Sequence, residues 1–176
     1  THQYLEFGAG TDFDRKLIVK ANAAELLEET FAKKRWSGEP VLFSGITDCY
    51  QPIESVYECT RRCLEVCRRY RNPVMIITKG AVIRRDVELL GAMAREMDVQ
   101  VNVSIAFDED VVSRAVEPGA PRPSHRFETV ARLAAAGVRV GVAVSPIVPG
   151  LNDHAVPRIL ERAHAAGARS AFMTLL

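Results

Sequence analysis

A set of hydroxyl, carboxylate and ammonium groups follows the short apolar runs of this 176-residue sequence. Its members are Ser44, Gly45, Thr47, Asp48, Thr78, Lys79, Ser104, Ser145 and Thr174. Hydroxyl and carbonyl oxygens accept hydrogen bonds from an ammonium group, and a lysine compensates an anion. The set is therefore suited to a polar zwitterion or a phosphate. For any single member the alternative is a residue that only caps a turn.

Three cysteines, Cys59, Cys63 and Cys67, form a second group with chemical potential, because thiolates bind soft metals. Their spacing of four falls within a helical pattern, where such positions drift by only about 40°. A straight helix holds them about 6 Å apart in a line, whereas the thiolates of an iron–sulfur cluster must converge. We interpret them as core packing. The alternative is a soft-metal or redox site, which requires lowered thiol pKa values.

The elements that must position these groups are visible as periodic patterns. Five short apolar runs predict strands at 40–45, 73–80, 99–106, 138–147 and 170–176. Stretches with helical periodicity lie at 23–34, 53–71, 85–97, 125–136 and 155–166. Their alternation predicts βα units and a parallel α/β sheet. Since active sites lie at the carboxyl ends of such strands, we expect the polar set to gather there.

The pattern within two strands favours a barrel over an open sheet. Residues 99–105 and 138–144 alternate valine or isoleucine with small or polar residues. Central strands of an open parallel sheet are usually apolar on both faces. One apolar face and one small or polar face are typical of a barrel-like sheet around a cavity. A doubly wound open sheet is the alternative.

Length and composition predict a single soluble domain over residues 1–176. The chain is 26% charged and 48% hydrophobic, and its net charge of +1 gives no global field for nucleic acid. No apolar run approaches the roughly 18 residues of a membrane span, and no signal peptide opens the chain. We expect a cytoplasmic protein without membrane contact. Thr1 is not preceded by Met, and the chain ends in an apolar run, so we expect truncation at both ends.

Several separated motifs resemble one known family. They are GTDFDRKLIVKANA, SGITDCYQPIE, ITKG, RRDVELL, VSIAFDEDVVSRAVEPGAPRPSHR and SPIVPGLND. Together they resemble the radical S-adenosylmethionine (radical SAM) superfamily. Within it, they are most similar to the branch related to spore photoproduct lyase, often labelled DNA repair photolyase-like. The resemblance covers nearly the whole chain.

The resemblance implies a partial (βα)6 TIM-like barrel that binds SAM and a 4Fe-4S cluster. The cluster ligands would form a Cys-x3-Cys-x2-Cys loop upstream of Thr1, so the first strand and the cluster loop would be missing here. We therefore assign no metal ligand within this chain. The reaction would be reductive cleavage of SAM to a 5′-deoxyadenosyl radical that abstracts hydrogen from an unknown substrate. The fragment alone would be inactive.

The same resemblance implies partners. The electron donor would be a protein such as flavodoxin or ferredoxin. DNA is a candidate partner, because DNA lesion repair is a candidate reaction. The substrate itself is not named by any motif.

The resemblance also gives roles to the residues around the methionine part of SAM. Oxygens of Ser44, Gly45 or Thr47 would meet its amino group. Lys79 would pair with its carboxylate, and Ser104 would contact the carboxylate or the ribose. These expectations agree with the general preference of ammonium groups for acceptors and of carboxylates for cations.

Further cofactor contacts are expected after the third and fourth strands of this chain. Arg114 would add a bidentate contact to the carboxylate, with Glu117 fixing it, or else form a surface ion pair. Ile147 would pack against the purine, and Asn152 or Asp153 would hold the following turn. Ser145 stands where a glycine is usual elsewhere in the superfamily.

Two neighbouring residues are expected near the substrate. Cys49 is a candidate hydrogen-atom donor, with a thiol of no function as the alternative. The donor cysteine of spore photoproduct lyase aligns with Gly45 instead. Asp48 would belong to the cofactor and substrate end, or would cap the helix that follows.

Two other functions compete with this interpretation. A phosphate-handling barrel enzyme would use Lys79 as a Schiff-base amine at a strand end. A nucleic-acid-binding module would use an arginine-rich helix, which carries Arg61, Arg62, Arg68 and Arg69.

Overall fold

The computed structural model describes residues 16–44 and 47–176. The strands are β1 (Val41–Phe43), β2 (Val74–Thr78), β3 (Val99–Ser104), β4 (Arg139–Ile147) and β5 (Ser170–Leu175). The α-helices are α2 (Ala23–Phe31), α3 (Glu54–Tyr57), α4 (Cys59–Arg69), α5 (Val87–Ala94), α6 (Asp110–Val116), α7 (Pro123–Ala135) and α8 (Val156–Ala165). Two 3₁₀ helices are η2 (Ala81–Asp86) and η3 (Asp153–Ala155).

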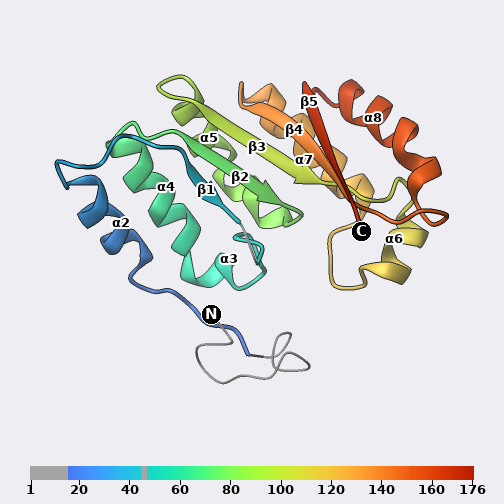
Figure 1. Cartoon of the computed structure of the whole chain (residues 1–176), viewed down its shortest axis with the longest axis horizontal. Coiled ribbons are helices and arrows are strands. Elements are labelled where there is room, and N and C mark those ends of the chain that lie inside the picture. The colour runs from blue at the N-terminus through green and yellow to red at the C-terminus, as the bar shows by residue number, and fades with distance from the viewer. Residues whose placement is uncertain (1–15, 45–46) are drawn as a thin grey trace.

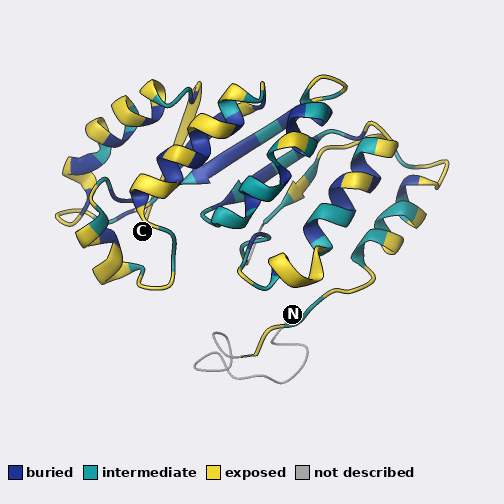
Figure 2. Cartoon of the chain, turned by 180° about the vertical axis from the view of Figure 1, so that it is seen from behind, coloured by how far each residue is buried: buried dark blue, intermediate teal, exposed yellow. Residues whose placement is uncertain are grey.

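All five strands are parallel and lie in the order β1-β2-β3-β4-β5 (Figure 1). The helices cover one face of this sheet, as the view from behind shows (Figure 2). A doubly wound sheet would reverse its strand order and carry helices on both faces. The sequential order and one-sided cover therefore make that alternative wrong for the described strands. The α/β arrangement is consistent with part of a TIM-like barrel.

The two faces of the sheet differ as the alternation predicted. On β3, Val101 and Val103 are buried against the helices, whereas Gln100 and Ser104 on the opposite, open face are half-buried. Asn102 also belongs to the open face but is only 2% exposed. A Cβ on Gly141 of β4 would lie 2.4 Å from its Oδ1, so the glycine makes room for the Asn102 side chain.

One long helix predicted over 53–71 is wrong, because the structure contains α3 and α4 with a break between them. Glu58 adopts a left-handed conformation (φ 51°) at the break. The buried Glu54 carboxylate accepts hydrogen bonds from the backbone N–H groups of Thr60 and Arg61 at 3.1–3.2 Å. The break thus allows a carboxylate to cap the N-terminus of α4, which a continuous helix would forbid.

The stretch predicted as a helix over 85–97 also begins differently. Its first residues belong to η2, and α5 starts only at Val87. The described part of the chain contains no helix long and apolar enough to span a membrane.

Gly80, directly after β2, marks a close backbone approach that can be tested. A Cβ at this position would lie 2.2 Å from the carbonyl oxygen of Tyr50. We expect Gly80→Ala to lower the free energy of unfolding by about 2 kcal/mol, because the loop after β1 must shift away. Urea denaturation checks this. Gly119→Ala is the control, since a Cβ there meets nothing within 4 Å; equal losses in both variants would contradict the prediction.

Candidate cofactor site at the carboxyl ends of the strands

The parallel sheet brings the predicted polar residues to one edge. Ser44 follows β1, Lys79 follows β2, Ser104 ends β3, and Ser145 lies near the end of β4. Thr78 pairs with Val103 in register, so Lys79 and Ser104 stand at the same level on adjacent strands. The Lys79 side chain extends from this level to Glu117 in the loop after α6. Lys79 is 39% exposed.

Lys79 is held by an acidic residue from the loop after α6. Its Nζ donates to Oε1 of Glu117 at 2.5 Å. The other oxygen of Glu117 accepts from Nη2 of Arg126 at 2.7 Å. The sequence-based pairing of Glu117 with Arg114 is therefore wrong. Arg114 is exposed in the last turn of α6.

Arg126 is a site residue that the sequence reasoning missed. Its side chain is only 2% exposed, and its guanidinium also donates to the carbonyl oxygens of Ser104 (3.0 Å) and Pro121 (2.6 Å). Burial alone would raise the pKa of Glu117, but the hydrogen bond from Lys79 and the charge of Arg126 outweigh it and lower the pKa. Glu117 is thus an anion that neutralises a buried arginine.

Asp48 joins the ends of β1 and β2. Its Oδ1 accepts from the Thr78 hydroxyl (2.6 Å) and the Tyr50 N–H (2.8 Å), and its Oδ2 accepts from the Lys79 N–H (2.8 Å). Both oxygens therefore have protein donors. The arrangement favours a role in positioning the backbone of Lys79 over direct contact with a ligand.

Asn152 has a similar role after β4. It is 1% exposed, its Nδ2 donates to the carbonyls of Ala106 and Pro146, and its Oδ1 accepts from the Val148 N–H at 2.7 Å. The side chain fixes the turn after β4, as predicted, and its amide groups have protein partners. Ile147 ends β4 at 8% exposure, which leaves a small apolar edge for contact.

The residues after β1 are described in part. Ser44 has a positive φ of 91°, and its hydroxyl donates to the carbonyl of Thr47 at 3.0 Å. Thr47 is exposed. Gly45, which was expected to approach the cofactor, lies outside the described residues.

Cys49 lies in the loop between Asp48 and the buried Tyr50. Its carbonyl accepts from the Thr60 hydroxyl at 2.6 Å, which ties this loop to α4. Burial, and then the charge of Asp48, raise the pKa of the Cys49 thiol well above its usual range. Cys49 therefore stays a neutral S–H group at physiological pH.

A buried ionic network lies beneath this loop, and the sequence reasoning missed it. Asp86 is fully buried and accepts from Arg61 (2.6 Å), Arg85 (3.0 Å) and the Tyr50 hydroxyl (3.0 Å). Arg85 also donates to Glu54 at 3.0 Å. Burial would raise the pKa of Asp86, but its arginine partners outweigh burial and lower it. The network joins the loop after β1, α3, α4 and η2.

The chain is similar to known proteins over most of its length. Residues 9–163 match the family model of the radical SAM superfamily. The chain belongs to the radical SAM superfamily. Membership implies the use of SAM and a 4Fe-4S cluster.

Three relatives show how far this radical SAM chain extends over similar proteins. An uncharacterized protein of Mycobacterium tuberculosis is 35% identical over 170 residues, which cover 96% of this chain and 50% of that protein. An uncharacterized protein of Methanocaldococcus jannaschii is 26% identical over 78% of this chain and 49% of its own length. The radical SAM Nalpha-GlyT isomerase of Pseudomonas phage M6 is 26% identical over 86% of this chain and 31% of its own length. The chain thus spans half or less of these relatives.

The three helical cysteines do not fit the radical SAM cluster. Cys63 and Cys67 are buried, and burial raises their pKa values to about 11 and about 12. Cys59 is only half-buried, and Arg62 donates to its sulfur at 3.6 Å, so the core prediction is wrong for this one thiol. Within residues 16–44 and 47–176, no group of three or more His, Cys, Asp or Glu side chains is arranged to hold a metal ion.

Alkylation distinguishes packed cysteines from reactive ones. We expect Cys63 and Cys67 to remain unmodified by iodoacetamide at pH 8 in the folded chain, because they are buried and protonated. Peptide mass spectrometry measures the modification. In urea all four cysteines should react, which is the control. Rapid alkylation of Cys67 in the folded chain would restore the metal or redox interpretation.

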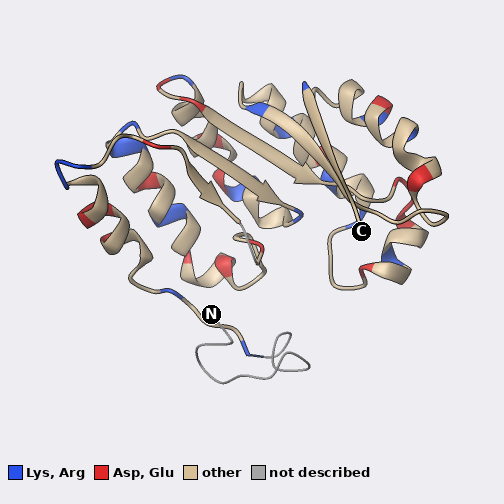
Figure 3. Cartoon of the chain, viewed as in Figure 1, with Lys and Arg blue, Asp and Glu red and all other residues tan. Residues whose placement is uncertain are grey.

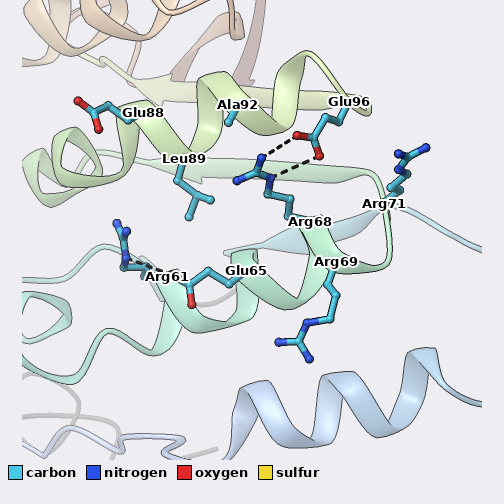
Figure 4. A pocket seen from close by; sticks show the side chains of 9 residues that line it. All are labelled: Arg61, Glu65, Arg68, Arg69, Arg71, Glu88, Leu89, Ala92 and Glu96. Atoms are coloured by element: carbon cyan, nitrogen blue, oxygen red, sulfur yellow. Dashed lines mark hydrogen bonds and ion pairs between the residues drawn. The ribbon is translucent and has the colours of Figure 1, made fainter.

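The arginine-rich helix α4 does not present a free basic surface. Arg61, Arg62, Arg68 and Arg69 each have a glutamate partner, namely Glu65, Glu25, Glu96 and Glu28. A hollow of about 740 Å³ lies beside α4. Arg68, on α4, reaches across it to Glu96 (Figure 4). Figure 3 shows acidic residues on α2 and basic residues on α4, and α2 itself contains no Lys or Arg. This neutralisation speaks against a nucleic-acid interface on α4.

Proposed function

We propose that residues 1–176 form a single radical SAM core domain whose cofactor site lies at the carboxyl ends of β1–β4. One observation carries the proposal. Lys79, Glu117 and Arg126 form a cluster of two cations and one carboxylate, so these three groups together carry one net positive charge. The nearby Asp48 carboxylate is held separately by Thr78, Tyr50 and the Lys79 N–H. Arg126 is buried, which leaves that charge on the accessible Lys79. A single cation beside hydroxyl groups is complementary to an amino-acid carboxylate.

Bound SAM together with a reduced 4Fe-4S cluster would supply a 5′-deoxyadenosyl radical for hydrogen abstraction from the substrate. The residues of this chain bind and orient the cofactor. Lys79 pairs with its carboxylate, Ser104 contacts the carboxylate or ribose, and oxygens of Ser44 and Thr47 accept from its amino group. Ile147 offers an apolar edge to the purine. The cluster ligands are not among the described residues.

Cys49 is proposed as the hydrogen-atom donor. A donor of this kind must carry its hydrogen, and burial keeps Cys49 as a thiol. Once a substrate is known, turnover in D2O should place one deuterium in the product, because the thiol exchanges with solvent. A product without deuterium would assign the donor role elsewhere.

The reaction after hydrogen abstraction rests on two resemblances. The name of the phage M6 relative states an isomerisation. The sequence motifs resemble the spore photoproduct lyase branch, which supports repair of a DNA lesion. Flavodoxin or ferredoxin would be the electron donor. The contact with Glu117 speaks against Lys79 as a Schiff-base amine, because its Nζ is already engaged by a carboxylate.

The deciding experiment uses a polypeptide that contains this chain together with the cluster cysteines. It is reconstituted anaerobically with iron and sulfide, reduced with dithionite and incubated with SAM. We expect 5′-deoxyadenosine, and none without dithionite. A reduced, cluster-loaded protein that forms no 5′-deoxyadenosine would defeat the proposal. Addition of UV-irradiated DNA then tests lesion repair, by the loss of the photoproduct.

A further inference from the structure

We infer that Arg126 and Glu117 are positioning residues for Lys79, and that they act on cofactor binding only through its ammonium group. The inference rests on the proposed function in one respect, because it takes the carboxylate of SAM as the ligand of Lys79. It adds two residues that do not touch the cofactor.

The first step is the anchoring of Arg126. Its three hydrogen bonds reach the carbonyls of Ser104 and Pro121 and the carboxylate of Glu117, and its side chain is 2% exposed. Two of these partners belong to different segments, the end of β3 and the loop before α7. A planar guanidinium with three fixed acceptors has little freedom, so it defines the position of Glu117.

Glu117, held in place by Arg126, in turn restricts the side chain of Lys79. Glu117 is 14% exposed, and its Oε1 accepts from the Lys79 ammonium. A free lysine side chain samples many rotamers, and a ligand that binds it must overcome that entropy. Here the ammonium is already fixed by Glu117. Two of its three N–H donors remain for a second carboxylate.

Glu117→Gln separates this role from simple packing. The glutamine oxygen can still accept from the buried Arg126, but its NH2 group then faces Lys79 and repels it. We expect the affinity for S-adenosylhomocysteine to fall about fivefold by isothermal titration calorimetry. The affinity for 5′-methylthioadenosine, which has no amino-acid carboxylate, should not change.

A double-mutant cycle tests the route through Lys79. In a Lys79→Gln background, Glu117→Gln should change the affinity for S-adenosylhomocysteine by less than about twofold. Equal losses in both backgrounds, or parallel losses for 5′-methylthioadenosine, would overturn the inference in favour of a structural role. Tighter binding by Glu117→Gln would overturn it as well, because Glu117 would then compete with the ligand.

A measurement without SAM chemistry keeps the inference separate from the proposed function. Acetylation of Lys79 by an N-hydroxysuccinimide ester, followed by peptide mass spectrometry, should be several-fold faster in Glu117→Gln and in Arg126→Lys. Glu128→Gln is the matched control on α7, since Glu128 pairs with Arg132 and Arg84 at the surface. Unchanged rates in Glu117→Gln would overturn the inference. If the native chain fails to bind S-adenosylhomocysteine but the rates change, only the proposed function fails.

Discussion

Asp86→Asn lowers the free energy of unfolding of this chain by about 3 kcal/mol. The carboxylate is fully buried and accepts hydrogen bonds from Arg61, Arg85 and Tyr50. Asparagine keeps the shape of the Asp86 side chain but removes its charge. Its NH2 group, itself a donor, then faces the N–H and O–H donors that the carboxylate had accepted from. Loss of one partner from a buried ionic pair costs about 3–5 kcal/mol, and the partial exposure of both arginines places this case at the lower end.

Urea denaturation followed by the fluorescence of the single tryptophan, Trp36, measures this loss. Glu96→Gln is the matched control, because it removes a carboxylate from an exposed ion pair with Arg68. Its denaturation midpoint should stay close to the native one. A midpoint for Asp86→Asn equal to that of the control would show that the network contributes little.

The same network gives a dependence on pH. The folded-state pKa of Asp86 is lowered, so the folded chain binds a proton less readily than the unfolded chain. The stabilising contribution is therefore complete above the unfolded pKa, about 4, and is lost as the pH falls through the folded value. The stability difference between the native chain and Asp86→Asn should shrink below about pH 4. A constant difference down to pH 2 would contradict the assignment.

Lys79→Gln weakens the binding of S-adenosylhomocysteine about 30-fold. Lys79 is the accessible cation of the cluster at the strand ends, and a hydrogen bond to a charged group contributes about 2 kcal/mol. Calorimetry with the native chain and the variant measures the ratio. The loss should be confined to ligands that carry a carboxylate.

Two comparisons make this result specific. The affinity for 5′-methylthioadenosine should be unchanged by Lys79→Gln. Lys33→Gln, an exposed position in the turn after α2, should change neither affinity. An unchanged affinity for S-adenosylhomocysteine in Lys79→Gln would remove Lys79 from the cofactor site. The proposed site would then lack its cation.

The strands, and the sheet edge that carries the site, could be predicted from the sequence because burial of one face produces a regular pattern of apolar residues along the chain. Short apolar runs predicted all five strands, and parallel pairing then brought Lys79 and Ser104 together. The break between α3 and α4 at Glu58 could not be predicted from the sequence. It depends on the Glu54 carboxylate meeting the first N–H groups of α4, and no local propensity encodes that contact.

The charged partners were missed because arginine and aspartate normally indicate a solvated face. A signal was nevertheless present. Arg126 lies at the helical spacing of the buried residues Phe127, Val130 and Leu133, and Asp86 lies three residues after the buried Ile83. A charge on an apolar stripe is rarely buried without a partner. The identity of the partner still depends on the tertiary fold.

The sequential strand order has a consequence for how the molecule assembles. Among residues 16–44 and 47–176, each strand pairs only with the strands before and after it in the chain, so no pairing between described strands spans more than one βα unit. Contacts of short sequence separation favour rapid folding. A unit that leaves the ribosome can dock on the completed edge of the growing sheet without waiting for distant segments. We therefore expect the sheet to grow in the direction of synthesis.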